Sequence, residues 1–157
     1  MSKKTIHPNL KKFDQMVMQG KATWWQMELP SGKVIFGETK TDMLGYNAED
    51  FTNYQDFTEL LHPDDQDKTM QAMRDHLSGQ NSIYHSIYRI QKNGGGYLTF
   101  YDYGKVVDKK DEKIKLIGFV FKLDKDIEKR KQAIKAFEDL IEGGDTSLLE
   151  LFGRVKA

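Results

Sequence analysis

A histidine followed closely by two aspartates is the part of this sequence that most resembles a reactive site. In "LLHPDDQDKTMQAM", His62 precedes Asp64 and Asp65. All three side chains can bind a metal ion, and a His–Asp pair can act as general acid and base. The same residues also suit a helix start, because Pro63 needs no hydrogen-bond partner there and first-turn carboxylates accept free N–H groups. No second cluster has ligand spacing, so we interpret the stretch as a helix start, with no catalytic residue and no metal site.

Composition removes several classes of chemistry. The 157-residue chain has no cysteine, which excludes thiol nucleophiles, thiolate metal sites and a cysteinyl-flavin adduct. Lys+Arg and Asp+Glu are both 24, so the formal net charge is zero and gives no indication of a nucleic-acid or anionic-membrane partner. The polar amino terminus and the lack of a long apolar run predict no signal peptide and no membrane span in this segment. We therefore expect a cytoplasmic protein.

Hydrophobic periodicity predicts the elements that must position these residues. The expected order is helix, two strands, several short helices, one longer helix, three strands and a helix. The helices are expected at residues 8–20, 63–78 and 124–142, and the strands at 23–29, 33–37, 81–92, 97–107 and 113–123. Strands on both sides of a helical middle indicate an α+β fold, in which a five-stranded antiparallel sheet carries short helices and one longer helix on one face.

Five sequence markers follow one another in a specific order and spacing. They are "WWQMELPSGKV", "MLGYNAEDF", "LLHPDDQDKTMQAMRDHLSGQ", "YRIQKNGGGYLTFYDYG" and "LIGFVFKLDKDIEKRK". Together they resemble a PAS domain of the sensory-box type, found in bacterial and archaeal signal-transduction proteins. The resemblance covers residues 21–132. One departure is modest: the family usually has Asp-Ile-Thr where this chain reads "LDKDIEKRK".

The resemblance implies a division of the chain into four parts. Residues 1–20 form an amino-terminal amphipathic helix, and residues 21–123 form the PAS domain. Residues 124–142 form a signalling or linker helix, and residues 143–157 are a tail or the truncated start of a following element.

The resemblance also implies a ligand pocket between the sheet and the helices. The strand alternation, read against the family, turns His85, Ile87, Arg89, Thr99, Tyr101 and Val120 toward the helices, and the cavity is closed by Trp25, Met27, Phe57, Met70 and Met73. In an apolar pocket, Arg89 would require a carboxylate ligand or an internal acid. Alternatively, Arg89 faces solvent and pairs with Asp102 or Glu28, because a one-residue shift in register exchanges the two faces. The sequence leaves both arrangements open.

The histidine positions argue against haem. Haem-binding PAS domains carry their histidine in the early half of the long helix, where this chain has Gln66, Asp67 and Lys68. His76 lies near the end of that helix, and His85 lies in the middle of a strand, so neither is placed as an axial ligand. Reversible flavin binding without a cysteine stays open, but no residue supports it.

The second face of the sheet leads us to expect a homodimer. Phe119 and Phe121, together with Phe100, make this face apolar, so the amino-terminal helix, a second copy of the chain or both must cover it. Isoleucines recur every seven residues in the last helix, which indicates a short coiled coil. The predicted dimer and signalling residues are Phe13, Val17, Phe119, Phe121, Ile127, Ile134, Phe137 and Ile141.

Our hypothesis is a sensor and dimerisation module, not an enzyme, within a signal-transduction protein such as a two-component or cyclase system. Binding of a small molecule or partner would change packing on the sheet and act through the last helix on a downstream output domain or partner protein. One alternative is a PAS domain with a filled core that serves protein interaction only. Another is a small α+β isomerase or dehydratase built on His85, Tyr101 and Asp102. Tyr101 and Asp102 are adjacent in a strand and point to opposite faces, which argues against that enzyme.

Overall fold

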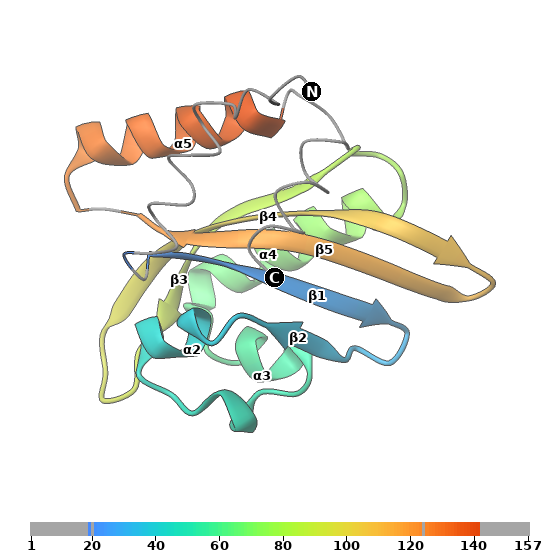
Figure 1. Cartoon of the computed structure of the whole chain (residues 1–157), viewed down its shortest axis with the longest axis horizontal. Helices are drawn as coiled ribbons and strands as arrows, with labels where there is room; N and C mark the ends of the chain where they lie inside the picture. Colours follow the sequence, from blue (N-terminus) through green and yellow to red (C-terminus); the bar gives the residue numbers. More distant parts are fainter. Residues whose placement is uncertain (1–18, 20, 124, 142–157) are drawn as a thin grey trace, which may run out of the picture.

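A five-stranded antiparallel sheet in the order β2-β1-β5-β4-β3 forms the centre of the molecule (Figure 1). The computed structural model describes residues 19, 21–123 and 125–141. The strands are β1 (Ala22–Leu29), β2 (Val34–Phe36), β3 (Tyr84–Gln91), β4 (Tyr97–Lys110) and β5 (Lys113–Lys122). The helices are α2 (Thr39–Leu44), a 3-10 turn η1 (Ala48–Asp50), α3 (Tyr54–Thr58), α4 (Pro63–Leu77) and α5 (Ile127–Ile141). The predicted fold class is confirmed.

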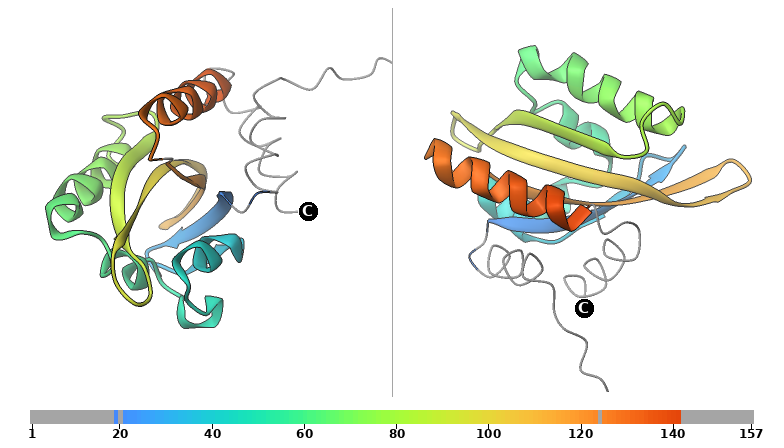
Figure 2. Two further views of the ribbon diagram at one scale, coloured as in Figure 1. Left: turned by 90° about the vertical axis from the view of Figure 1, so that its left-hand side faces the viewer. Right: turned by 90° about the horizontal axis from the view of Figure 1, so that it is seen from above.

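Helices α2 to α4 lie against one face of the sheet, which we call the inner face. Helix α5 lies on the opposite side from α4, toward the outer face (Figure 2). None of the described helices is long and apolar enough to cross a membrane. The helix predicted over residues 8–20, with Phe13 and Val17, lies outside the described residues apart from Gln19, and so does the segment 143–157.

Turn and cap residues explain where the elements begin and end. The "NGGG" turn joins β3 to β4 with positive φ at Gly94, Gly95 and Gly96, a conformation that glycine adopts without steric cost. Helix α3 begins with a capping box, in which the Asn53 side chain accepts from the Gln55 N–H and the Asp56 carboxylate accepts from the Asn53 N–H. These local signals separate the short helices from one another.

The prediction of which β3 side chains face inward is wrong. Tyr84, Ser86, Tyr88 and Ile90 are buried on the inner face, while His85 and Ile87 are exposed and Arg89 is half-buried. The inner face of β4 follows from the register, because Tyr88 pairs with Phe100 and Ser86 with Asp102. Thr99 and Tyr101 pair with Arg89 and Ile87 and therefore lie on the outer face.

Val120 and Phe100 both lie on the inner face. Val120 pairs with Asp102 and is fully buried in the core. Phe100 packs in the same core, so its assignment to the outer face beside Phe119 and Phe121 is wrong. Both faces of β3 carry apolar side chains, so the alternation of residue types does not show which face of the sheet is the inner one.

The outer face is buried at its centre. Phe119 and Phe121 are fully shielded from solvent, and the Phe121 ring stacks on Tyr101 with 4.9 Å between centroids. Ile127 at the start of α5 is 63% exposed, and Ile134 is half-buried. The side chains of Phe137 and Ile141 lie outside the described residues. The expected dimer therefore stays a prediction.

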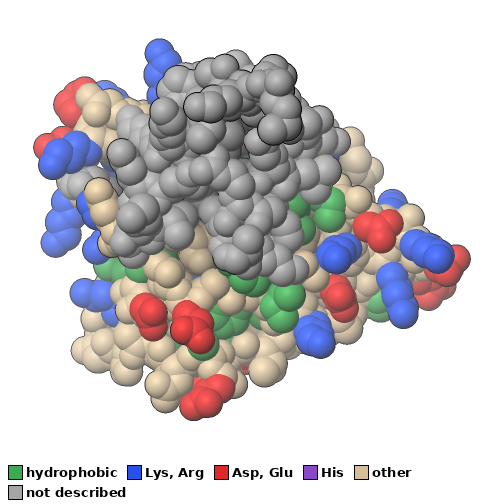
Figure 3. Space-filling model, in the orientation of Figure 1, with side chains coloured by type: hydrophobic (Ala, Val, Ile, Leu, Met, Phe, Trp, Pro, Cys, Tyr) green, Lys and Arg blue, Asp and Glu red, His purple; other side chains and the backbone are tan. Residues whose placement is uncertain are grey.

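Charges of both signs are mixed at the tip of the β4–β5 hairpin, visible on the right of Figure 3. The exposed tip reads Asp108, Lys109, Lys110, Asp111, Glu112 and Lys113. Such mixing creates no large field of one sign, in agreement with the zero net charge of the chain.

Candidate ligand cavity

A mostly apolar cavity of about 250 Å³ lies between the inner face of the sheet and the helices α2 to α4. Five predicted pocket residues line it, namely Trp25, Met27, Phe57, Met70 and Met73. The other lining residues are Leu29, Val34, Phe36, Lys40, Tyr54, Thr58, Leu61, Thr69, Arg74, Leu77, Tyr84, Tyr88, Ile90 and Asp102. The predicted His85, Ile87, Arg89, Thr99 and Tyr101 lie on the outer face instead, and Val120 is in the core beside the cavity without lining it.

The Trp25 indole passes over two glycines of neighbouring strands. Gly118 pairs with Trp25 on one side and with Gly104 on the other, so the three residues form a row across the sheet. A Cβ atom at Gly104 would lie 2.5 Å from the Trp25 ring, and one at Gly118 would also overlap it. Only glycine leaves this space open, so the two residues position the indole at the base of the cavity.

Asp102 is the centre of a buried polar network within the cavity. The Trp25 Nε1–H donates to Asp102 Oδ1 at 2.6 Å, and the Tyr88 hydroxyl donates to Oδ2 at 2.9 Å. Burial raises the pKa of Asp102, while the charge of Lys40 and these hydrogen bonds oppose the rise. Burial, together with the nearby carboxylate, raises the pKa of both Tyr84 and Tyr88. The two tyrosines therefore remain protonated phenols near neutral pH.

Lys40 is a buried lysine that lines the cavity. It lies in α2, and its Nζ is 3.8 Å from the centroid of the Phe57 ring, a cation–π contact. Burial lowers the pKa of Lys40, and the carboxylate of Asp102 opposes this shift.

Sequence reasoning did not identify Lys40, Tyr84 or Tyr88 as cavity residues, and Asp102 was considered only for other roles. One signal was available for Asp102: it lies in "YLTFYDYG", an otherwise aromatic strand. Lysine is rarely fully buried, and Lys40 lies in the polar stretch "ETKTD", which gives no such signal.

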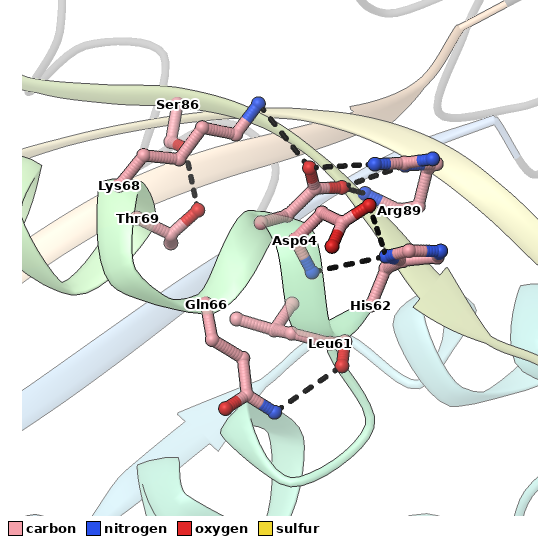
Figure 4. A network of polar contacts seen from close by, with 9 residues as sticks. Leu61, His62, Asp64, Gln66, Lys68, Thr69, Ser86 and Arg89 are labelled. Atoms are coloured by element: carbon pink, nitrogen blue, oxygen red, sulfur yellow. Dashed lines mark hydrogen bonds and ion pairs between the residues drawn. The ribbon is translucent and has the colours of Figure 1, made fainter.

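The stretch around His62 forms a helix start (Figure 4). His62 is the N-cap, and its Nδ1 accepts from the Asp64 N–H at 3.1 Å, while Pro63 occupies the first turn. Its backbone N–H donates to the carbonyl of Arg89 in the edge strand β3. Within the described ranges, no three His, Cys, Asp or Glu residues gather where they could hold a metal ion.

Asp65 joins the start of α4 to β3 through Arg89. Its carboxylate accepts from the Arg89 backbone N–H at 2.8 Å, from Nε at 2.9 Å and from Nη2 at 3.0 Å. Arg89 therefore lies on the outer face, as in the second arrangement considered from the sequence, but its partner is Asp65 and not Asp102 or Glu28. Asp65 also satisfies a backbone N–H that the edge strand would otherwise leave free.

We expect the stability contributed by Asp65 to disappear in acid. The side-chain hydrogen bond from Arg89 holds the pKa of Asp65 well below its usual range, whereas the unfolded chain has an ordinary pKa of about 4. As pH falls, the unfolded state binds the proton first, so this stability is present above about pH 5 and is lost below it. Asp65→Asn should lower the free energy of unfolding by about 1–2 kcal/mol at neutral pH. This difference should shrink by about 1 kcal/mol at pH 3, as measured by urea unfolding.

The matched control is Asp67→Asn, an exposed residue of the same helix. It should change the free energy of unfolding by less than about 0.5 kcal/mol at either pH. A difference between wild type and Asp65→Asn that stays constant from pH 7 to pH 3 would contradict the assignment.

The two histidines considered for haem have other positions. His76 Nδ1 contacts the Asn81 carbonyl at 2.9 Å, and Nε2 accepts from the Val106 N–H at 3.0 Å, so the ring donates from Nδ1. His85 is exposed on the outer face and stacks beside Tyr101. Neither lines the cavity, so neither is placed to be an axial ligand there. The inward pair that the isomerase alternative requires is likewise not assembled, because His85 and Tyr101 lie opposite Asp102 across the sheet.

Comparison with known proteins agrees with this architecture. A model of the PAS fold family matches residues 35–120. A sensory box histidine kinase/response regulator from Burkholderia thailandensis is similar in structure, with 18% identity, a TM-score of 0.59 and coverage of 85% of this chain and 99% of that chain. The N-terminal domain of a diguanylate cyclase with a PAS/PAC sensor from Marinobacter aquaeolei has 23% identity, a TM-score of 0.58 and coverage of 65% and 94%. At these identities the similarity establishes the fold alone. No curated protein sequence matches the chain.

One similar structure raises the question of a flavin. It is a light-oxygen-voltage domain studied with a flavin analogue, with 12% identity, a TM-score of 0.55 and coverage of 82% of this chain and 95% of that chain. The cavity here, about 250 Å³, is below the range of about 300–1,000 Å³ that is common for drug-sized ligands. The Trp25 indole also fills the centre of the sheet. Neither feature supports the binding of a flavin mononucleotide, which has three fused rings and a phosphorylated side chain.

Proposed function

The chain belongs to the PAS fold family, and we propose that it is a sensory module that binds a small molecule in its cavity and passes binding to α5. The observation that carries this proposal is the cavity itself. A domain that served only as an interaction surface would need no apolar space beside a buried polar network. An engineered cavity of about 150 Å³ takes up benzene, so a volume of about 250 Å³ is sufficient for one substituted ring.

We propose that the effect of binding reaches α5 along β5. Gly118 of β5 lies beneath the Trp25 indole, so a ligand that moves the indole presses on this strand. Near the end of the strand, Leu123 is buried and its N–H donates to the Thr99 carbonyl. Asp126 then accepts from the N–H groups of Glu128 and Lys129 at the start of α5. A shift of β5 therefore changes the position from which α5 begins.

We also propose that α5 pairs with α5 of a second copy, giving a homodimer that acts on an output domain or partner protein. The support is the exposure of Ile127, 63%, at a position that begins a seven-residue repeat. Exposed apolar side chains in such a repeat are typical of helices that pair.

One experiment tests ligand binding in the cavity, its effect on α5 and the pairing of α5 between two copies of the chain. We expect toluene to enter the cavity of the wild-type chain, with shifts in the NMR signals of lining methyl groups. Hydrogen exchange of the α5 amides should change when toluene binds, and should slow as protein concentration rises. The matched control is Met73→Trp, which fills the cavity from α4 and should abolish uptake. No uptake by the wild type would favour the interaction-only alternative; uptake with unchanged α5 exchange would contradict transmission.

A further inference from the structure

Lys40 has no role in the arrangement described so far. It is 6% exposed and lines the cavity, and its close contact is with the Phe57 ring. Among the described residues, no carboxylate or carbonyl oxygen accepts a hydrogen bond from its Nζ. The nearby acid is Asp102, but each of its oxygens already accepts a hydrogen bond, one from Trp25 and one from Tyr88. Asp102 acts on Lys40 through its charge.

An ammonium group in this position lacks acceptors. It carries three N–H donors. The Phe57 ring contacts the ammonium group from one side only and offers no hydrogen-bond acceptor atom. In the described part of the chain, every fully shielded side-chain nitrogen or oxygen has a hydrogen-bond partner. Because Lys40 Nζ has none, the nitrogen must border open space, and the open space beside it is the cavity.

The balance of charge around the cavity also favours an anion. Of the described residues that line it, Lys40 and Arg74 have basic side chains and Asp102 alone has an acidic one. Arg74 is exposed and lies at the rim, where its Nε and Nη2 both donate to Gln71 Oε1. A cation would be repelled by protonated Lys40, and ionised Asp102 would repel a dianion more strongly than a monoanion.

We infer that the ligand is a small organic acid: one carboxylate accepts hydrogen bonds from Lys40, and an apolar body about the size of a single ring packs against Met70, Met73 and Leu77. This inference rests on the proposed function, because it names the class of ligand for the same cavity. Phe57 and Asp102 then hold the lysine side chain in place for the ligand.

The test compares each acid with its neutral amide. The probes are benzoate with benzamide and phenylacetate with phenylacetamide, measured by calorimetry on the full chain, with toluene uptake as a separate measure of an open cavity. We expect each carboxylate to bind about tenfold more tightly than its amide. Lys40→Met, which keeps the length and removes the charge, should abolish this preference without abolishing toluene uptake. Lys40→Arg should keep it, and so should Lys33→Met, an exposed lysine outside the cavity.

The outcomes separate the two proposals. If toluene enters but carboxylates bind no better than amides, the carboxylate inference is overturned and the sensory cavity stands. If Lys40→Met keeps the preference for carboxylates, Lys40 is not the group that recognises them, and the inference is overturned. If neither toluene nor any acid or amide binds, both proposals are overturned. If Lys40→Met does not fold, the inference is decided by the ratio of carboxylate affinity to amide affinity in the wild type and in Lys40→Arg.

Discussion

Replacing Asp102 with alanine should lower the free energy of unfolding by about 3–5 kcal/mol, which is a large share of the stability of a domain this size. The change removes the acceptor of the Trp25 indole N–H and of the Tyr88 hydroxyl, both of which are buried. Each unsatisfied donor costs about 1–3 kcal/mol. It also leaves Lys40 without the carboxylate whose charge favours its protonated form. Urea unfolding followed by tryptophan fluorescence measures the change.

Two further variants separate the hydrogen bonds from the charge. Asp102→Asn keeps an acceptor oxygen for Trp25, and the Tyr88 hydroxyl can turn to accept from the new amide, so we expect less than half the loss of Asp102→Ala. Asp108→Ala, at an exposed position of the same strand, should change the free energy of unfolding by less than about 0.5 kcal/mol. A loss below about 1 kcal/mol for Asp102→Ala would mean that the network is dispensable.

The order of elements and the fold could be predicted from the sequence because local signals agree with the global structure. "NGGG" places a tight hairpin between β3 and β4, and the three glycines adopt the positive φ that such a turn requires. At the start of α4, the His62 side chain accepts from the nearby Asp64 N–H, and Pro63 occupies the first turn. In both cases the partners are close in sequence, so the pattern contains the interaction.

The side chains of β3 could not be assigned to faces in the same way. Tyr84, Tyr88 and Ile90 on one face and Ile87 on the other are all apolar, so burial alone does not choose between them. The choice depends on partners distant in sequence. Asp102 accepts the Tyr88 hydroxyl inside, and Asp65 binds Arg89 outside. Predicting the inner face correctly would have required knowledge of these two pairs beforehand.

Only part of the cavity lining could be predicted from the sequence, for a related reason. Trp25, Met27, Phe57, Met70 and Met73 are apolar, and an apolar side chain facing a core is the default expectation. Lys40 and Asp102 are exceptions to that default, since each is buried within the same cavity. Their burial depends on each other and on the Phe57 ring, a three-part arrangement with no signature in the spacing of the sequence.

Gly104→Ala should destabilise the wild-type chain by about 1–3 kcal/mol, but much less once Trp25 is shortened. The added Cβ would lie 2.5 Å from the Trp25 ring and 3.0 Å from the Ile117 carbonyl oxygen. The ring cannot retreat without breaking its 2.6 Å hydrogen bond to Asp102. Trp25→Leu alone should lower the free energy of unfolding by about 3 kcal/mol, because it removes a buried ring and leaves Asp102 without one donor.

A double-mutant cycle tests whether position 104 requires glycine because the Trp25 indole occupies the space above it. In the Trp25→Leu background, we expect Gly104→Ala to cost less than about 0.5 kcal/mol, which gives a coupling energy of about 1–2 kcal/mol between the two sites. Met27→Leu is the matched background: it is close to volume-conserving, and Met27 lines the cavity without being among the nearest contacts of Gly104. There, Gly104→Ala should cost as much as in the wild type. If the losses of free energy from Trp25→Leu and Gly104→Ala are additive, the two positions are not coupled. Glycine would then be required at position 104 by the backbone and not by the Trp25 indole.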